Sequence, residues 1–168
     1  MVTLLKLPDL PEEIRNAVNN HQLVIFAGAG ISQQIGYPSW DELTSKMLSK
    51  CLEDKKIDFN RFHLLDSTEF KDNRILLSII HEHYGDDSLF NKRISELLKY
   101  KPAIKKNNLV KTIVHYGVSI VTTNYDKSFE YVGKHYHSYT SCNAVNPPLK
   151  SPYVVHLHGS IGDGNSII

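Results

Sequence analysis

The sequence predicts an α/β fold built on a doubly wound parallel sheet. Three short apolar runs rich in β-branched residues lie at 23–27, 118–123 and 153–157, and such runs are typical of parallel strands covered on both faces. Helical patterns separate the runs, which favours crossover connections over hairpins. Each run ends in a polar or glycine-rich turn, and the carboxyl ends of parallel strands share one edge of a sheet. We therefore expect three turns that are distant in sequence to converge on one site.

The first half of the chain is expected to be largely helical. The segment 11–19 begins with a proline, which suits the first turn of a helix. Ser39 and Glu42 have the spacing of a capping box, which predicts a helix over 40–52. The segment 57–71 has no regular pattern. Apolar residues at helical spacing predict two further amphipathic helices, at 73–84 and 88–100.

The second half alternates between helices and the two remaining strands. Helices are expected at 104–116, where Gly117 ends the pattern, and at 127–134. The segment 143–152 holds three prolines and is expected to be a loop. We interpret 1–168 as a single domain in which 41–108 forms a helical insertion or a helical layer.

Composition and charge exclude several classes of protein. Hydrophobic residues make up 41% and charged residues 22% of the chain, so disorder of the whole chain is not expected. The net charge of +1 gives no strong signal for nucleic acid or anionic lipid. Cys51 and Cys142 are too few for a four-thiolate zinc site. No secretory pattern and no apolar run of about 20 residues is present, so we expect a soluble cytoplasmic protein with no membrane partner.

The turn after the first run is a candidate phosphate-binding loop. Gly28, Ala29 and Gly30 have minimal side chains, which lets backbone amides approach a pyrophosphate closely. The spacing is not the usual dinucleotide fingerprint, because residues 31–35 intervene before Gly36. A tight turn without a ligand explains the same residues equally well.

Polar candidates follow the other two runs. Asn124 and Asp126 can hydrogen-bond ribose hydroxyls, a water or a carboxamide, and they can equally cap the helix that follows them. His158 ends the third run, where a neutral imidazole could take a proton from a ribose hydroxyl or a water. A histidine that only packs at the strand edge is the simpler interpretation of His158 alone.

Several histidines are spaced by two residues. His156 would point the same way as His158 along a strand, so a two-histidine metal pair is conceivable. No further ligands complete such a site, and we expect no metal. Two other pairs are expected on helices, where this spacing does not share a face: His81 with His83, and His135 with His137.

Four short segments occur in an order that is more specific than any one of them. They are Gly28-Ala29-Gly30-Ile31-Ser32, Gly36-Tyr37-Pro38, Thr123-Asn124-Tyr125-Asp126 and His158-Gly159-Ser160. Together they resemble the sirtuin family. The Thr-Thr-Asn-Tyr-Asp sequence at 122–126 makes the nearer likeness one to bacterial sirtuin-like NAD hydrolases that act against phages. The resemblance covers the motif-bearing segments, and 43–108 contributes little to it.

This resemblance implies a Rossmann-like sheet that binds NAD. Asn124 would hold a water and the nicotinamide ribose, Asp126 would lie near the nicotinamide carboxamide, and His158 would be the base. Cleavage of the glycosidic bond would pass through an oxocarbenium-like state, as in glycosidases. The positions implied to line the NAD phosphates and the neighbouring ribose are Gly28, Ala29, Gly30 and Ser32.

The chain departs from the deacylase branch of the family at several positions. That branch usually has a glutamine where this chain has Thr123, and an aromatic–arginine pair where it has Trp40 and Asp41. It also carries a four-cysteine zinc module, which this chain cannot build. These differences weaken an acyl-lysine activity. Family members normally continue beyond the last motif with strands that hold adenosine, so we expect a truncated chain in which the second half of the sheet is missing.

The leading hypothesis is an NAD hydrolase that releases nicotinamide and ADP-ribose and depletes NAD in antiphage defence. The expected partners are NAD itself and either further copies of the chain or another defence protein. One alternative is a module that senses NAD or ADP-ribose without turnover, in which His158 would be dispensable. A protein deacylase and a purely structural role are the others.

Overall fold

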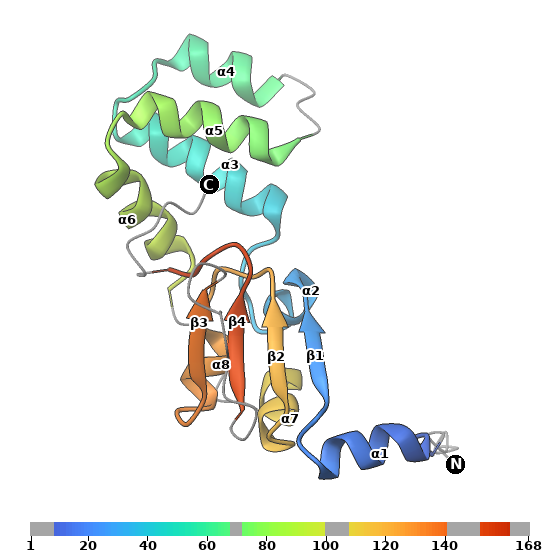
Figure 1. Cartoon of the computed structure of the whole chain (residues 1–168). Coiled ribbons are helices and arrows are strands. Elements are labelled where there is room, and N and C mark those ends of the chain that lie inside the picture. Colours follow the sequence, from blue (N-terminus) through green and yellow to red (C-terminus); the bar gives the residue numbers. More distant parts are fainter. Residues whose placement is uncertain (1–8, 68–71, 100–107, 141–151, 162–168) are drawn as a thin grey trace.

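The computed structural model describes residues 9–67, 72–99, 108–140 and 152–161. Within them lies a four-stranded sheet in the order β1-β2-β4-β3, and every pair of neighbouring strands is parallel (Figure 1). The strands are β1 (Val24–Ala27), β2 (Ser119–Thr122), β3 (His137–Thr140) and β4 (Tyr153–His156). The prediction of a mixed α/β fold with a parallel sheet is confirmed at this level, and β1, β2 and β4 are the three apolar runs.

The strand register places the carboxyl ends of all four strands in one row. Ala27 pairs with Thr122, Thr122 with His156, and His156 with Thr140. The segments that follow these residues therefore leave the sheet at the same level and on the same edge. This is the edge where ligands bind in open parallel sheets.

Strand β3 is an element that the sequence analysis did not predict. Its sequence, His-Ser-Tyr-Thr, has no apolar run, and its first two residues are exposed because β3 forms an edge of the described sheet. The helix expected at 127–134 is shorter, with α8 at Ser128–Val132. The expectation that His135 and His137 lie on a helix was wrong: His135 is in a turn and His137 begins β3.

The two faces of the sheet are covered differently. Glu130 of α8 contacts His156 and Ser138, which places α8 on the face that also carries Ile25, Ile120 and Val154. Helix α7 (Leu109–His115) packs against α8 behind the sheet in Figure 1. On the opposite face, the side chains of Val24 and Phe26 in β1 are 46% and 66% exposed. The expectation that each strand is covered on both faces is therefore wrong for β1.

Two short helices flank β1. Helix α1 (Glu12–Asn19) precedes it, as predicted, but Pro11 is its N-cap residue and does not lie in the first turn. Helix α2 (Ala29–Gln33) begins directly after Gly28. The expected small-residue turn at 28–32 is thus mostly a single helical turn.

Four helices pack on one another beyond the carboxyl edge of the sheet (Figure 1), and we call them the helical module. They are α3 (Trp40–Glu53), α4 (Phe59–Ser67), α5 (Asn73–Tyr84) and α6 (Asp87–Leu97). The predicted capping box is present, since the backbone N–H of Ser39 donates to Glu42 Oε2 at 2.9 Å and that of Glu42 donates to Ser39 Oγ at 3.2 Å. Helix α4 was not predicted, because Leu65 is its one buried residue and its apolar pattern is weak.

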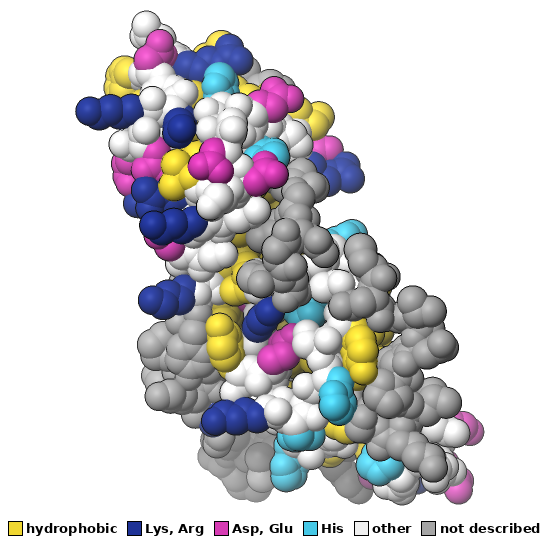
Figure 2. Space-filling view, turned by 60° about the vertical axis from the view of Figure 1, so that its left-hand side comes forward, with side chains coloured by type: hydrophobic (Ala, Val, Ile, Leu, Met, Phe, Trp, Pro, Cys, Tyr) yellow, Lys and Arg dark blue, Asp and Glu magenta, His cyan; other side chains and the backbone are white. Residues whose placement is uncertain are grey.

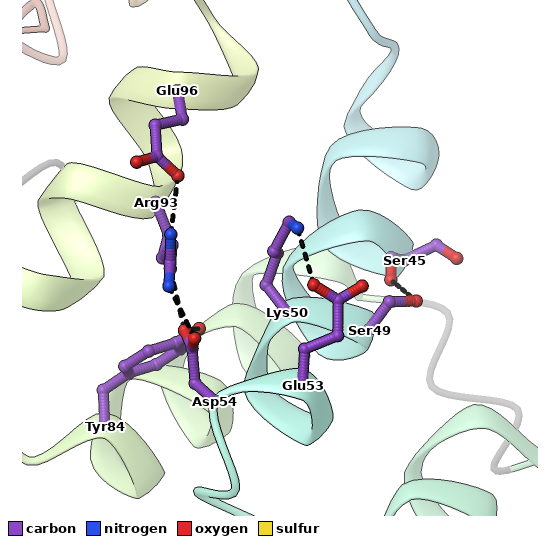
Figure 3. Close-up of polar contacts among 8 residues, drawn as sticks. All are labelled: Ser45, Ser49, Lys50, Glu53, Asp54, Tyr84, Arg93 and Glu96. Carbon is purple, nitrogen blue, oxygen red and sulfur yellow. Dashed lines mark hydrogen bonds and ion pairs between the residues drawn. The ribbon is translucent and has the colours of Figure 1, made fainter.

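A polar cluster fastens three of these helices to one another (Figure 3). The Arg93 guanidinium on α6 donates to both carboxylate oxygens of Asp54, at 2.6 and 2.8 Å, and the Tyr84 hydroxyl on α5 donates to the same carboxylate at 3.0 Å. The hydrogen bond from Arg93 lowers the pKa of the Asp54 carboxyl despite its partial burial. Because Asp54 directly follows α3, the cluster joins the end of that helix to α5 and α6.

On the face shown in Figure 2, acidic and basic side chains are intermingled over the helical module, and several histidines gather over the sheet. That face therefore has no region in which side chains of one charge dominate.

Among the described residues, no helix combines the length and the apolar character that crossing a membrane requires. The predicted loop at 143–152 lies outside the described residues except for Pro152, and so do the start of the helix expected at 104–116 and Cys142.

Candidate functional site

The segments that follow β1 and β2 are joined by hydrogen bonds at the carboxyl edge of the sheet. The Thr122 hydroxyl donates to the carbonyl of Ala27 at 2.9 Å. The Asn124 Nδ2 amide donates to the carbonyl of Gly28 at 3.0 Å and to Ser32 Oγ at 2.8 Å. Because the Gly28 carbonyl only accepts, the orientation of the Asn124 amide is fixed. Two of the four motif segments, more than 90 residues apart in sequence, therefore form one structure.

Asp126 completes this network. The Ser32 hydroxyl donates to Asp126 Oδ2 at 2.7 Å, and the backbone N–H of Ser128 donates to Asp126 Oδ1 at 3.0 Å. Ser32, Asn124 and Asp126 are all buried. The alternative role as a helix cap thus holds in part for Asp126, which contacts the first residue of α8. It does not hold for Asn124, whose side chain bonds to the β1–α2 segment instead.

A small cavity of about 40 Å³ lies beside this network. Ser32, Asn124 and Asp126 line it from the edge of the sheet, and Leu43 of α3 and Leu98, just beyond α6, line it from the other side. Both hydrogens of the Asn124 amide are used, whereas its Oδ1 accepts no hydrogen bond from the described residues. The cavity wall therefore includes a buried amide whose oxygen has no partner among the described residues.

Aromatic rings form another part of the cavity wall. Trp40, the first residue of α3, meets Tyr125 edge to face with ring centroids 5.6 Å apart, and both residues line the cavity. Burial raises the pKa of the Tyr125 phenol. An edge-to-face pair of this kind is a rigid, apolar boundary for the space between the sheet and the module.

His158 lies at the same edge but outside the cavity wall. Its ring centroid is 6.5 Å from that of Tyr125, and its side chain is exposed. The backbone N–H of Ile161 donates to the Tyr125 carbonyl at 3.0 Å, which ties the segment after β4 to the segment after β2. The three turns thus meet at one edge of the sheet, with Asn124 and Asp126 buried and His158 at the surface.

The glycines after β1 are not required by their backbone conformation. Gly28 is extended, with φ −109° and ψ −178°, and Gly30 lies within α2. A Cβ atom built on either residue would meet nothing within 4 Å. The space beside both residues is therefore open, which is compatible with close approach of a ligand to the backbone.

A buried histidine–carboxylate pair lies behind Asn124. The His156 side chain is fully buried, its Nδ1 lies 2.8 Å from the Asn124 carbonyl oxygen, and its Nε2 lies 2.7 Å from Glu130 Oε1. The Ser138 hydroxyl donates to the same Glu130 oxygen at 2.8 Å. The conceivable metal pair of His156 with His158 is not formed, because His156 is bonded to other groups. The described residues contain no cluster of three or more metal-ligating side chains.

Sequence reasoning missed Glu130, although one signal was available. His156 shares a strand face with Val154, which is fully buried. A histidine predicted on a buried face needs a polar partner, and a glutamate on the neighbouring predicted helix is a natural candidate. Choosing Glu130 from the sequence alone would still require the position of α8 over β4.

Burial and pairing act in opposite directions on this pair. Burial by itself would lower the pKa of His156, but the hydrogen bond and charge of Glu130 outweigh it and raise that pKa. Burial would likewise raise the pKa of the Glu130 carboxyl, yet the hydrogen bond from His156 outweighs it and lowers that pKa. Both shifts favour an imidazolium–carboxylate pair.

No protein family model matches the chain, and comparison with curated protein sequences finds no match. The function must therefore be inferred from the geometry of the site and from the residues that form it.

Proposed function

We propose that this chain is the NAD-binding part of a Rossmann-like domain that hydrolyses the bond between nicotinamide and ribose, in the manner of bacterial sirtuin-like NAD hydrolases. One observation carries the proposal: the buried Asn124 amide bonds to Gly28 and Ser32 at the carboxyl edge of a parallel sheet. These bonds join the glycine-containing segment to the Asn-Tyr-Asp segment at the edge where open parallel sheets bind dinucleotides.

Each motif position has a place in this proposal. The open space beside Gly28 and Gly30 would admit the NAD phosphates close to the backbone. The Oδ1 of Asn124, which accepts no hydrogen bond from the described residues, would hold the attacking water or a ribose hydroxyl. Asp126, which accepts from Ser32, would lie near the nicotinamide carboxamide. The cavity of about 40 Å³ is much smaller than a dinucleotide, so NAD would enter it with one end only.

The reaction needs few groups, because nicotinamide leaves as a neutral molecule. The C1′–nitrogen bond breaks, positive charge develops on the ribose, and water adds at C1′ with loss of a proton. His158 would accept that proton as the general base. In a defence protein, repeated turnover would deplete cellular NAD.

The proposal is tested by incubating the full-length protein with NAD and measuring free nicotinamide. Asn124→Ala and His158→Ala should each abolish release, since one loses the group that orients water and the other loses the base. Asn16→Ala and His115→Ala replace the same residue types at exposed positions in α1 and α7 and should retain activity. Equal turnover by all four variants would reject the proposal.

A specific observation favours a second candidate, an NAD or ADP-ribose sensor without turnover. His158 is exposed and outside the cavity wall, whereas Ser32, Asn124 and Asp126 are buried within it. A sensor predicts saturable binding in calorimetry, no nicotinamide release, and unchanged affinity in His158→Ala. A protein deacylase predicts a third pattern, in which nicotinamide appears only when an acylated peptide is added.

A further inference from the structure

The side chain of His156 is enclosed by hydrogen-bond acceptors. One ring nitrogen faces the backbone carbonyl of Asn124 at 2.8 Å, and the other faces the carboxylate of Glu130 at 2.7 Å. The side chain of His156 has no solvent exposure, and that of Glu130 is 16% exposed. Water therefore cannot replace either partner of the imidazole ring.

The groups that face the two ring nitrogens fix the protonation state of His156. A carbonyl oxygen can only accept, so Nδ1 must carry a proton. A neutral ring would then present a bare Nε2 to the carboxylate, which places two acceptors 2.7 Å apart unless a proton lies between them. Imidazole is the more basic of the two groups, with an ordinary pKa near 6.5 against about 4.3 for glutamate. The shared proton therefore resides on the ring, and His156 is an imidazolium.

The imidazolium connects the interior of the domain to the candidate site. Glu130 is held from two sides, because its Oε1 accepts from His156 on β4 and from Ser138 on β3. His156 in turn donates to the carbonyl of Asn124, the residue whose side-chain amide reaches Gly28 and Ser32. Hydrogen bonds thus link Ser138 on β3 to Glu130 on α8, and Glu130 to His156 on β4. His156 is linked in turn to Asn124, whose side chain bonds to the segment after β1.

We infer that His156, held in its doubly protonated form by Glu130, is a positioning residue that fixes the Asn124 backbone and thereby the orientation of the Asn124 amide in the site. The part of this inference that concerns catalysis rests on the proposed function. The protonation of His156 and the order of the Asn124 amide do not, and both can be measured without NAD.

The inference gives the site a pH dependence with a defined direction. The charged groups that face His156 are Glu130 on α8 and Asp126 after β2, both acidic, while β3 and β2 contribute the neutral Ser138 and Thr122. Both carboxylates raise the pKa of the ring. Above its elevated pKa the ring would keep its Nδ1 proton but lose the Nε2 proton that bonds to Glu130, and two acceptors 2.7 Å apart would then push the ring out of place. Order at Asn124 should therefore persist above the ordinary titration range of histidine and fall as pH rises through the elevated pKa. Removing the Glu130 charge should move this loss to lower pH by about one to three units.

The first measurement is nitrogen NMR of the full-length protein, with the His156 signal assigned by its absence in His156→Gln. At pH 7.5 both ring nitrogens of His156 should be protonated in the wild-type protein, and Glu130→Gln should shift the titration downward. Exchange of the Asn124 side-chain amide hydrogens should be slow in the wild type and faster in Glu130→Gln at the same pH. Glu96→Gln is the matched control, because Glu96 pairs with Arg93 on the distant helix α6 and should change neither signal.

The second measurement is the pH profile of kcat/KM for NAD. Its decrease at alkaline pH should begin at a lower pH in Glu130→Gln than in the wild-type protein, and Glu96→Gln should not shift it. A neutral His156 at pH 7.5, or unchanged Asn124 amide exchange in Glu130→Gln, overturns the inference. If Glu130→Gln does not fold, the wild-type titration decides: amide exchange must rise with pH more steeply than hydroxide concentration alone requires. A wild-type protein that shows these NMR properties but never cleaves NAD refutes the proposed function and leaves the role of His156 standing.

Discussion

Ser32 occupies the centre of the buried network at the carboxyl edge of the sheet. Its hydroxyl oxygen accepts from the Asn124 amide and its hydrogen is donated to Asp126, so one small side chain serves both polar residues of the second motif segment. A serine can do this because a hydroxyl is both a donor and an acceptor. An alanine is almost the same size but offers neither function.

Replacing Ser32 by alanine should therefore destabilise the domain. The change leaves one Asn124 amide hydrogen and one Asp126 oxygen without their partner in a buried place, which costs about 1–3 kcal/mol of unfolding free energy. Urea unfolding followed by circular dichroism measures it. Ser49→Ala is the matched control, because the Ser49 hydroxyl donates to the Ser45 carbonyl within the same helix α3, outside the buried network (Figure 3). Similar losses in the two variants would contradict the role assigned to Ser32.

At the same scale, the residues of the site differ in how far the sequence could reveal them. Asn124, Asp126 and His158 could be named because each lies within three residues of the end of an apolar run. The partner of His156 could not be named, because Glu130 lies 26 positions away and meets it only through the packing of α8 on β4. The burial of Asn124 and the exposure of His158 depend on the same tertiary packing.

At the scale of elements, α3 begins at a capping box that also borders the candidate cavity. Ser39 satisfies the backbone N–H of Glu42, and Glu42 satisfies that of Ser39. Ser39→Ala should lower the free energy of unfolding by about 1 kcal/mol, which a shift of the urea midpoint would report. Ser45→Ala, at an exposed position within the same helix, should have little effect or stabilise slightly, because alanine has the higher helix propensity. An equal loss of unfolding free energy in Ser45→Ala and Ser39→Ala would contradict the role assigned to this cap.

Elements with a strong apolar signal were predicted, and those without one were not. Strands β1, β2 and β4 and helices α3, α5 and α6 all carry runs or stripes of apolar residues, and each was recognised. Strand β3 is polar because it lies at an edge, and α4 keeps Phe59 63% exposed. Both elements form because their neighbours provide hydrogen bonds or packing, a contribution that a local pattern does not contain.

For the whole molecule, the important relation is the one between the sheet and the helical module. The parallel sheet made the meeting of three turns predictable, because its carboxyl ends share an edge. The other wall of the cavity was not predictable, since it requires the first turn of α3 and Leu98, just beyond α6, to lie over that edge. Trp40 and Tyr125 form the aromatic contact at this junction.

A ligand that enters at this junction should slow backbone hydrogen exchange on both of its sides. With NAD present, we expect protection at 40–43 and at 123–126, because these segments contribute opposite walls of the cavity and a ligand that binds the folded state suppresses local opening. Helix α4 (59–67) contributes no residue to the cavity and should exchange unchanged. Asn124→Ala should remove the protection at both segments together, since the amide that would anchor NAD is absent. Protection confined to the sheet would show that NAD binds without the helical module, and equal protection of α4 would show a general stabilisation instead of binding at the junction.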